Sequence, residues 1–106
     1  MRMMLKIAIP TETANTHIAG GTFPAVMQNF LGDIKPEAAY FVAENGVRTA
    51  YFFVQMTDAS QLPAFAEPAF LAFHAKVDVT PAMNLDDLKA AMPAIEASVK
   101  KYQKGK

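Results

Sequence analysis

The side chains that could exchange protons with a substrate are few in this sequence. His17 and His74 are the only histidines, and an imidazole pair can serve as general acid and base near neutral pH. The chain path argued below brings the end of the first strand and the start of the fourth to one sheet edge. The two histidines could meet there, with Asn15 and Glu12 nearby. The competing interpretation makes them two unrelated residues at loop ends.

Three further side chains could contribute to a site. Tyr40 and Tyr51 are expected to face each other across a hairpin, where two phenols could line a ligand pocket or pack at a dimer interface. Glu67 precedes Pro68 in an otherwise apolar helix. If a kink turned this carboxyl inward, burial would raise its pKa and make it an acid–base candidate. Otherwise it faces solvent.

Metal and cofactor chemistry have no support in the sequence. Cysteine is absent, and the two histidines belong to no spacing typical of metal ligands. We therefore expect no metal and no cofactor, so that any chemistry would depend on the side chains alone.

Composition narrows the class of protein. The 106 residues are 52% hydrophobic and 19% charged, which excludes intrinsic disorder and fits one domain over residues 1–106. Ten basic side chains balance ten acidic ones, so the basic excess of a nucleic-acid-binding protein is missing. The opening apolar run is short and contains Lys6, and no stretch has the length of a membrane span. We expect a cytoplasmic protein without a membrane partner.

Hydrophobic periodicity then predicts the elements that position these residues. Strands are expected at residues 5–9, 38–44, 47–56 and 75–80, and a polar loop at 11–16. Apolar residues from Phe23 to Ile34 recur at helical spacing, with Thr22 as N-cap. Further helices are predicted from Asp58 and from Asn84. Pro68 is expected to break or kink the first of them, and Pro93 to divide the second into two pieces.

The hairpin defines two faces of the sheet. Asn45-Gly46 between two strand-like runs is a strong hairpin signal and sets the register, with Tyr40 opposite Tyr51. One face is almost wholly apolar apart from Arg48, and we expect it to face the helices. The other face carries charged and polar side chains together with several aromatic ones, and we expect it to pair with a second copy of the chain.

The order βαββαβα predicts an α+β, ferredoxin-like fold with an antiparallel sheet in the order 4-1-3-2, helices on one face and an added C-terminal helix. This arrangement resembles the small dimeric α/β-barrel proteins, which pair two such sheets face to face. Residues 36–41 (PEAAYF) and 81–88 (PAMNLDDL) resemble small uncharacterised bacterial proteins of about this length. The resemblance implies a homodimer. The wider class includes cofactor-free monooxygenases, isomerases and haem-degrading enzymes, and a shared fold does not choose among them.

Three functional hypotheses follow. The first is a homodimeric domain that binds a small molecule in a pocket or has a non-enzymatic interaction role. The second is a cofactor-independent enzyme, of monooxygenase or isomerase type, that uses histidine and tyrosine side chains. The third is RNA binding through the aromatic sheet face, which lacks both an aromatic residue in the first strand and a basic excess.

Overall fold

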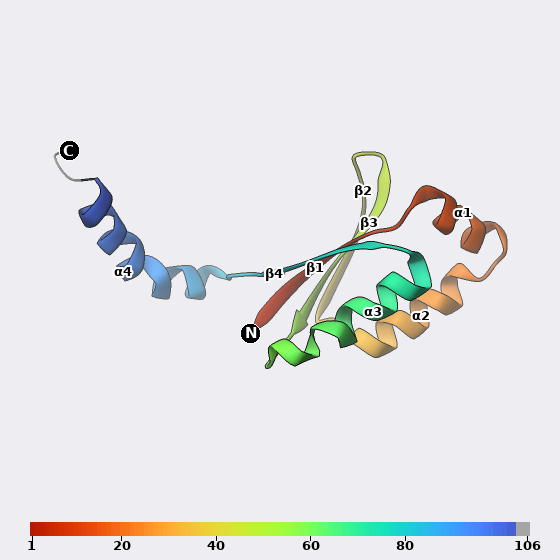
Figure 1. Cartoon of the computed structure of the whole chain (residues 1–106), viewed down its shortest axis with the longest axis horizontal. Coiled ribbons are helices and arrows are strands. Elements are labelled where there is room, and N and C mark those ends of the chain that lie inside the picture. Colours follow the sequence, from red (N-terminus) through yellow and green to blue (C-terminus); the bar gives the residue numbers. More distant parts are fainter. Residues whose placement is uncertain (104–106) are drawn as a thin grey trace.

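The computed structural model describes residues 1–103 and contains four strands and four α-helices. Figure 1 shows the arrangement. In chain order the elements are β1 (Arg2–Ala8), α1 (Thr11–Ala19), α2 (Phe23–Ile34), β2 (Ala38–Glu44), β3 (Val47–Gln55), a short 3-10 turn (Ala59–Gln61), α3 (Leu62–Phe73), β4 (Lys76–Pro81) and α4 (Leu85–Tyr102). The α+β class is confirmed.

The four strands form one antiparallel sheet in the order β2-β3-β1-β4, which is the predicted order seen from the opposite edge. The turn between β2 and β3 is made by Asn45 and Gly46, whose φ angles of 53° and 76° are both positive. Only residues that tolerate this region can close so tight a turn. The predicted register is confirmed, because Tyr40 lies opposite Tyr51.

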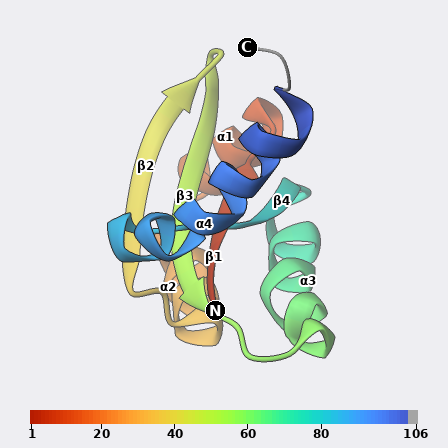
Figure 2. The same ribbon diagram turned by 90° about the vertical axis from the view of Figure 1, so that its left-hand side faces the viewer.

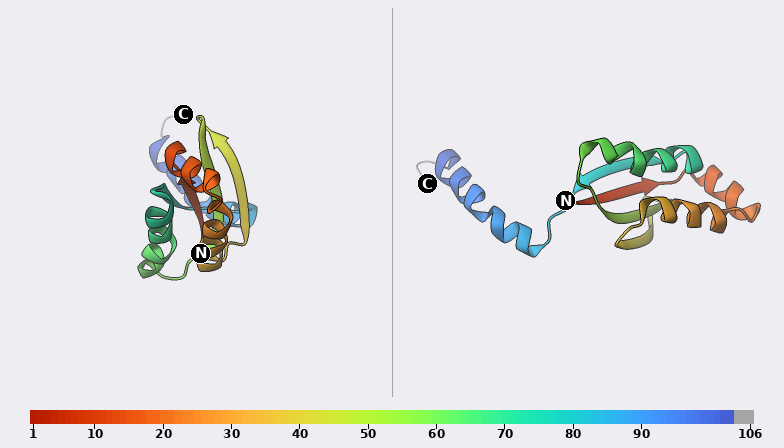
Figure 3. Two further views of the ribbon diagram at one scale, coloured as in Figure 1. Left: turned by 90° about the vertical axis from the view of Figure 1, so that its right-hand side faces the viewer. Right: turned by 90° about the horizontal axis from the view of Figure 1, so that it is seen from below.

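Helices α2 and α3 lie side by side on one face of the sheet, as Figures 2 and 3 show, and leave the other face open. The core between these layers comes from alternate residues of the inner strands and from the apolar stripes of the two helices. Its largest fully buried side chains are Phe52, Phe73, Leu5, Ile7 and Val54. The four strand residues among them lie on the face that the sequence predicts to be helix-facing, and Phe73 comes from α3.

The segment predicted as a polar loop is a helix, which corrects the prediction for residues 11–16. Helix α1 begins directly after Pro10, whose carbonyl accepts from the Ala14 amide at 3.0 Å. The Thr16 hydroxyl donates to the Glu12 carbonyl inside the helix, at 2.9 Å. Threonine and asparagine weaken the local helical signal. Tertiary packing decides the outcome here, because the Ala14 side chain is fully buried.

The two prolines do not interrupt their helices, so the predicted division of the last helix at Pro93 is wrong, and Pro68 does not break the helix before it. Helix α3 continues through Pro68 and α4 continues through Pro93. A proline removes one backbone donor and leaves a carbonyl without its helical partner. Water can reach that carbonyl in α4, where every turn is exposed, and the burial of Ala66, Ala69 and Phe73 holds α3 in place.

Helix α4 extends past the end of the sheet at which β1 begins and β4 ends, away from α2 and α3 (Figures 1 and 3). The chain is consequently elongated, with principal extents of 63 × 30 × 21 Å. No residue of α4 is buried. Its apolar side chains therefore contribute nothing to the core described above.

Candidate functional site

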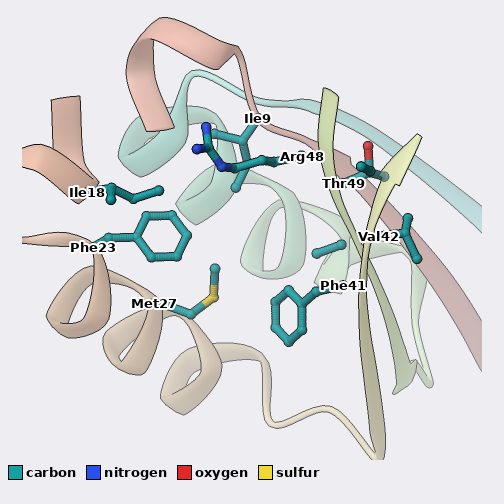
Figure 4. A pocket seen from close by; sticks show the side chains of 10 residues that line it. Ile9, Ile18, Phe23, Met27, Phe41, Val42, Arg48 and Thr49 are labelled. Carbon is teal, nitrogen blue, oxygen red and sulfur yellow. The ribbon is translucent and has the colours of Figure 1, made fainter. Parts of the chain in front are cut away.

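An apolar pocket of about 400 Å³ opens between α1, α2 and the β2–β3 hairpin. Figure 4 shows Phe23, Met27 and Phe41 directed into this space. Its other lining residues are Ile9, Ile18, Val42, Ala43, Arg48, Thr49 and Ala50. We call this cavity the hairpin pocket.

The hairpin pocket exists because the helices do not reach the outer strand of the sheet. Phe41 of β2 and Phe52 of β3 share the helix-facing side and touch edge to face, with ring centroids 5.8 Å apart. Phe52 is fully buried under the helices, whereas Phe41 is 60% exposed. The prediction that this whole face is covered is therefore wrong for β2.

Arg48 is the one charged side chain among the described residues that line the hairpin pocket. Its Nη1 donates to Asn15 Oδ1 at 2.9 Å, which anchors the guanidinium between β3 and α1. Its other N–H groups make no hydrogen bond to the described part of the chain. A guanidinium held in this way can donate hydrogen bonds to a carboxylate or sulfonate of an apolar ligand.

His17 occupies a structural position. Its Nδ1 lies 2.9 Å from the Thr22 hydroxyl and its Nε2 lies 3.2 Å from the carbonyl oxygen of Ala72 in the last turn of α3. A carbonyl can only accept, so Nε2 carries the proton of this bond. The ring also packs edge-on against Phe73, with centroids 6.2 Å apart. Both ring nitrogens therefore have protein partners, and the His17 side chain connects α1 to α3. We call this connection the clip.

The other predicted members of the histidine site are spread over that end of the molecule. His74 is exposed and ends α3 with a left-handed backbone, two residues beyond the carbonyl that His17 contacts. No hydrogen bond joins the two imidazoles among the described residues. Glu12 is exposed on α1, and Asn15 accepts a hydrogen bond from Arg48 of the hairpin pocket.

The open sheet face carries a polar cluster formed by Lys6, Glu44 and Tyr51. The Glu44 carboxylate pairs with the Lys6 ammonium and accepts a hydrogen bond from the Tyr51 hydroxyl. Lys6 and Tyr51 together lower the pKa of Glu44, while the hydrogen bonds to Glu44 raise the pKa of Lys6 and of Tyr51. A second cavity of about 410 Å³ lies beside the cluster, with Lys76 and Asp78 on its rim.

The remaining two predicted residues stand apart. Tyr40 is 60% exposed on the open face and packs against Phe53, with ring centroids 6.4 Å apart. Glu67 is exposed on α3, so the buried-carboxylate alternative does not hold. Helix α3 presents Glu67 to solvent because its buried positions are Ala66, Ala69 and Phe73.

Sequence reasoning overlooked Arg48 as a site residue, although a signal was present. Arg48 is the single charge on the predicted helix-facing side of the hairpin, where burial without a partner would be costly. Within residues 1–103, no group of three or more histidine, aspartate or glutamate side chains is placed to hold a metal ion. None of the described helices combines the length and the apolar character that a membrane span requires.

No protein-family model, curated protein or solved structure matches this chain. The proposal about function therefore rests on the geometry of the molecule.

Proposed function

We propose that this chain is a ferredoxin-like domain that forms a homodimer through its open sheet face and binds a small apolar molecule with an acidic group in the hairpin pocket. The observation that carries the proposal is the exposure of Phe41 in a cavity with one anchored cation. Contiguous exposed apolar side chains that line a groove are typical of ligand-binding sites.

The lining of the hairpin pocket favours binding over catalysis. Apolar side chains form its walls, and Arg48 and Thr49 are its only polar members among the described residues. The Thr49 hydroxyl already donates to the carbonyl of Val47 at 3.0 Å. No carboxylate or imidazole of the described residues lines the pocket to act as a general base. Such a cavity supplies apolar contact and one anion anchor, which are the usual parts of a ligand site.

The homodimer is supported by the composition of the open face. Tyr40 and Val42 are 60% and 44% exposed there, next to a mixed-charge cluster that includes Lys6 and Glu44. The net charge of the chain is zero, so two copies do not repel each other. The element order and the antiparallel sheet support the ferredoxin-like assignment.

Two fluorescent probes with the same apolar part test the pocket. One is 8-anilinonaphthalene-1-sulfonate, and the other is N-phenyl-1-naphthylamine, which lacks the sulfonate. Arg48→Gln should weaken binding of the sulfonate probe about tenfold, the value of one charge-assisted contact, and leave the neutral probe unchanged. Arg48→Lys should lie between the two because it keeps the charge and loses the planar fork.

A second pair of variants locates the bound probes. Ala43→Trp places a large ring in the hairpin pocket and should abolish binding of both probes. Ala39→Trp is the matched control, because Ala39 lies on the same strand and the same face but outside the pocket. Probe binding that survives Ala43→Trp, or that Arg48→Gln weakens equally for both probes, would show that the proposed site is wrong.

A further inference from the structure

Local sequence signals define both ends of helix α4. At its start the Asn84 and Asp87 side chains cap each other's backbone, with N···O distances of 2.8 and 2.9 Å. Acidic residues stand in its first turn and Lys100 and Lys101 in its last, as the helix dipole favours. The sequence therefore encodes a helix of 18 residues here, although the described part of the chain offers it little to pack against.

One side of α4 is an apolar stripe with helical spacing, which we call the arm stripe. Its members are between 40% and 76% exposed: Leu85, Leu88, Met92, Ile95, Val99 and Tyr102. Isolated helices of this length are marginal in water and depend on packing of their apolar face. The arm stripe thus requires a surface that its own sheet and helices do not provide.

The attachment of α4 directs it away from its own domain. The Ala82 amide donates to the Arg2 carbonyl at 3.2 Å, and the Arg2 guanidinium pairs with Asp87 at 3.3 Å. These two contacts hold the first turn of α4 at the end of the sheet. A helix of 18 residues then projects about 27 Å from that point. Folding it back over α2 and α3 would break the ion pair between Arg2 and Asp87.

We propose that the arm stripe packs on a second copy of this chain, so that each protomer of the homodimer holds its partner with α4. This inference rests on the homodimer in the proposed function and adds a second contact surface to it. A two-fold axis that pairs the open faces also gives each projecting helix a neighbouring copy to contact.

The available area supports a second copy as the occupant. The exposed parts of the arm stripe, together with Tyr40 and Val42 on the open face, amount to apolar surface on the order of 800 Å² per protomer. A stable interface buries roughly 800 Å² of polar and apolar surface per partner, so this apolar area is enough to form one. Tyr40 and Val42 on the open face supply only about a quarter of this apolar area, so most of it belongs to the arm stripe.

The test combines static light scattering with hydrogen exchange of residues 85–102 in the full-length protein, over a wide range of concentration. We expect a dimer whose α4 amides gain protection in step with dimer formation. Ile95→Asp should raise the dimer Kd at least about a hundredfold, since the symmetric interface buries the charge twice, and should remove the protection of α4.

Ala97→Asp is the matched control, because it adds the same charge two residues away on the opposite side of α4 and should leave the dimer intact. Equal effects of the two substitutions would overturn the proposal. So would a dimer whose α4 stays unprotected, or a monomer whose α4 is protected by its own chain. Neither substitution touches the hairpin pocket, so retained binding of the neutral probe verifies folding and separates failure of the arm contact from failure of the ligand site.

Discussion

Replacing His17 with alanine should lower the free energy of unfolding by about 2–3 kcal/mol, because the imidazole joins parts of the chain that are distant in sequence. Its Nε2 donates to the carbonyl of Ala72, one of the last carbonyls of α3 and therefore without a partner inside that helix. Its Nδ1 bonds the Thr22 hydroxyl at the entrance to α2. Each hydrogen bond contributes about 1 kcal/mol and the edge-on contact with Phe73 about 0.5–1 kcal/mol.

The measurement is urea unfolding followed by circular dichroism, at one fixed protein concentration because the stability of a dimer depends on concentration. For a domain of this size the expected loss corresponds to a fall in Tm of about 10 °C. His74→Asn is the control, since His74 is exposed and asparagine accepts its left-handed backbone. If His17→Ala unfolds at the same urea concentration as His74→Asn, His17 is not a clip between the helices.

Two further predictions follow from the backbone and the charges. His74→Gly should raise the free energy of unfolding by about 0.5 kcal/mol in the same urea experiment. Glycine relieves about 1 kcal/mol of left-handed strain at φ 52°, and the greater conformational entropy of the unfolded glycine chain offsets part of this gain. An unchanged or lower urea midpoint would contradict this prediction. In an alkaline titration at 295 nm, the Tyr51 phenol should ionise above its ordinary pKa, and Glu44→Gln should move that step to lower pH. These pKa shifts also predict how the stability of the fold depends on pH. The pKa of Tyr51 is raised, so the stability that this phenol contributes is present at neutral pH and is lost as the pH rises through its pKa. The pKa of Glu44 is lowered, so the stability that this carboxylate contributes is lost as the pH falls through its pKa. Identical alkaline titrations of the two proteins would show that Glu44 does not hold this phenol.

The elements that could be predicted are those encoded by neighbouring residues. Asn45 and Gly46 close the hairpin because both accept positive φ, and that turn alone determines which side chains face each other across β2 and β3. The start of α4 at Asn84 follows from a reciprocal cap with Asp87. In both places a few adjacent side chains carry the information.

The features that could not be predicted depend on distant parts of the chain. Helix α1 has a polar composition typical of loops, and its buried anchor Ala14 is too small to produce a hydrophobic period. Phe41 and Phe52 occupy equivalent positions in the strand pattern, yet only one lies under a helix. The reach of α2 and α3 across the sheet determines that difference, and with it the hairpin pocket.

The contacts of His17 link the clip to the hairpin pocket. The clip fixes α1 against the end of α3 through the Ala72 carbonyl. Helix α1 in turn supplies Asn15, which anchors Arg48, and Ile18, which forms part of the wall. His17, whose imidazole suits proton transfer, therefore also fixes the position of α1. It holds in place the helix that gives the hairpin pocket both its charge anchor and one of its apolar sides.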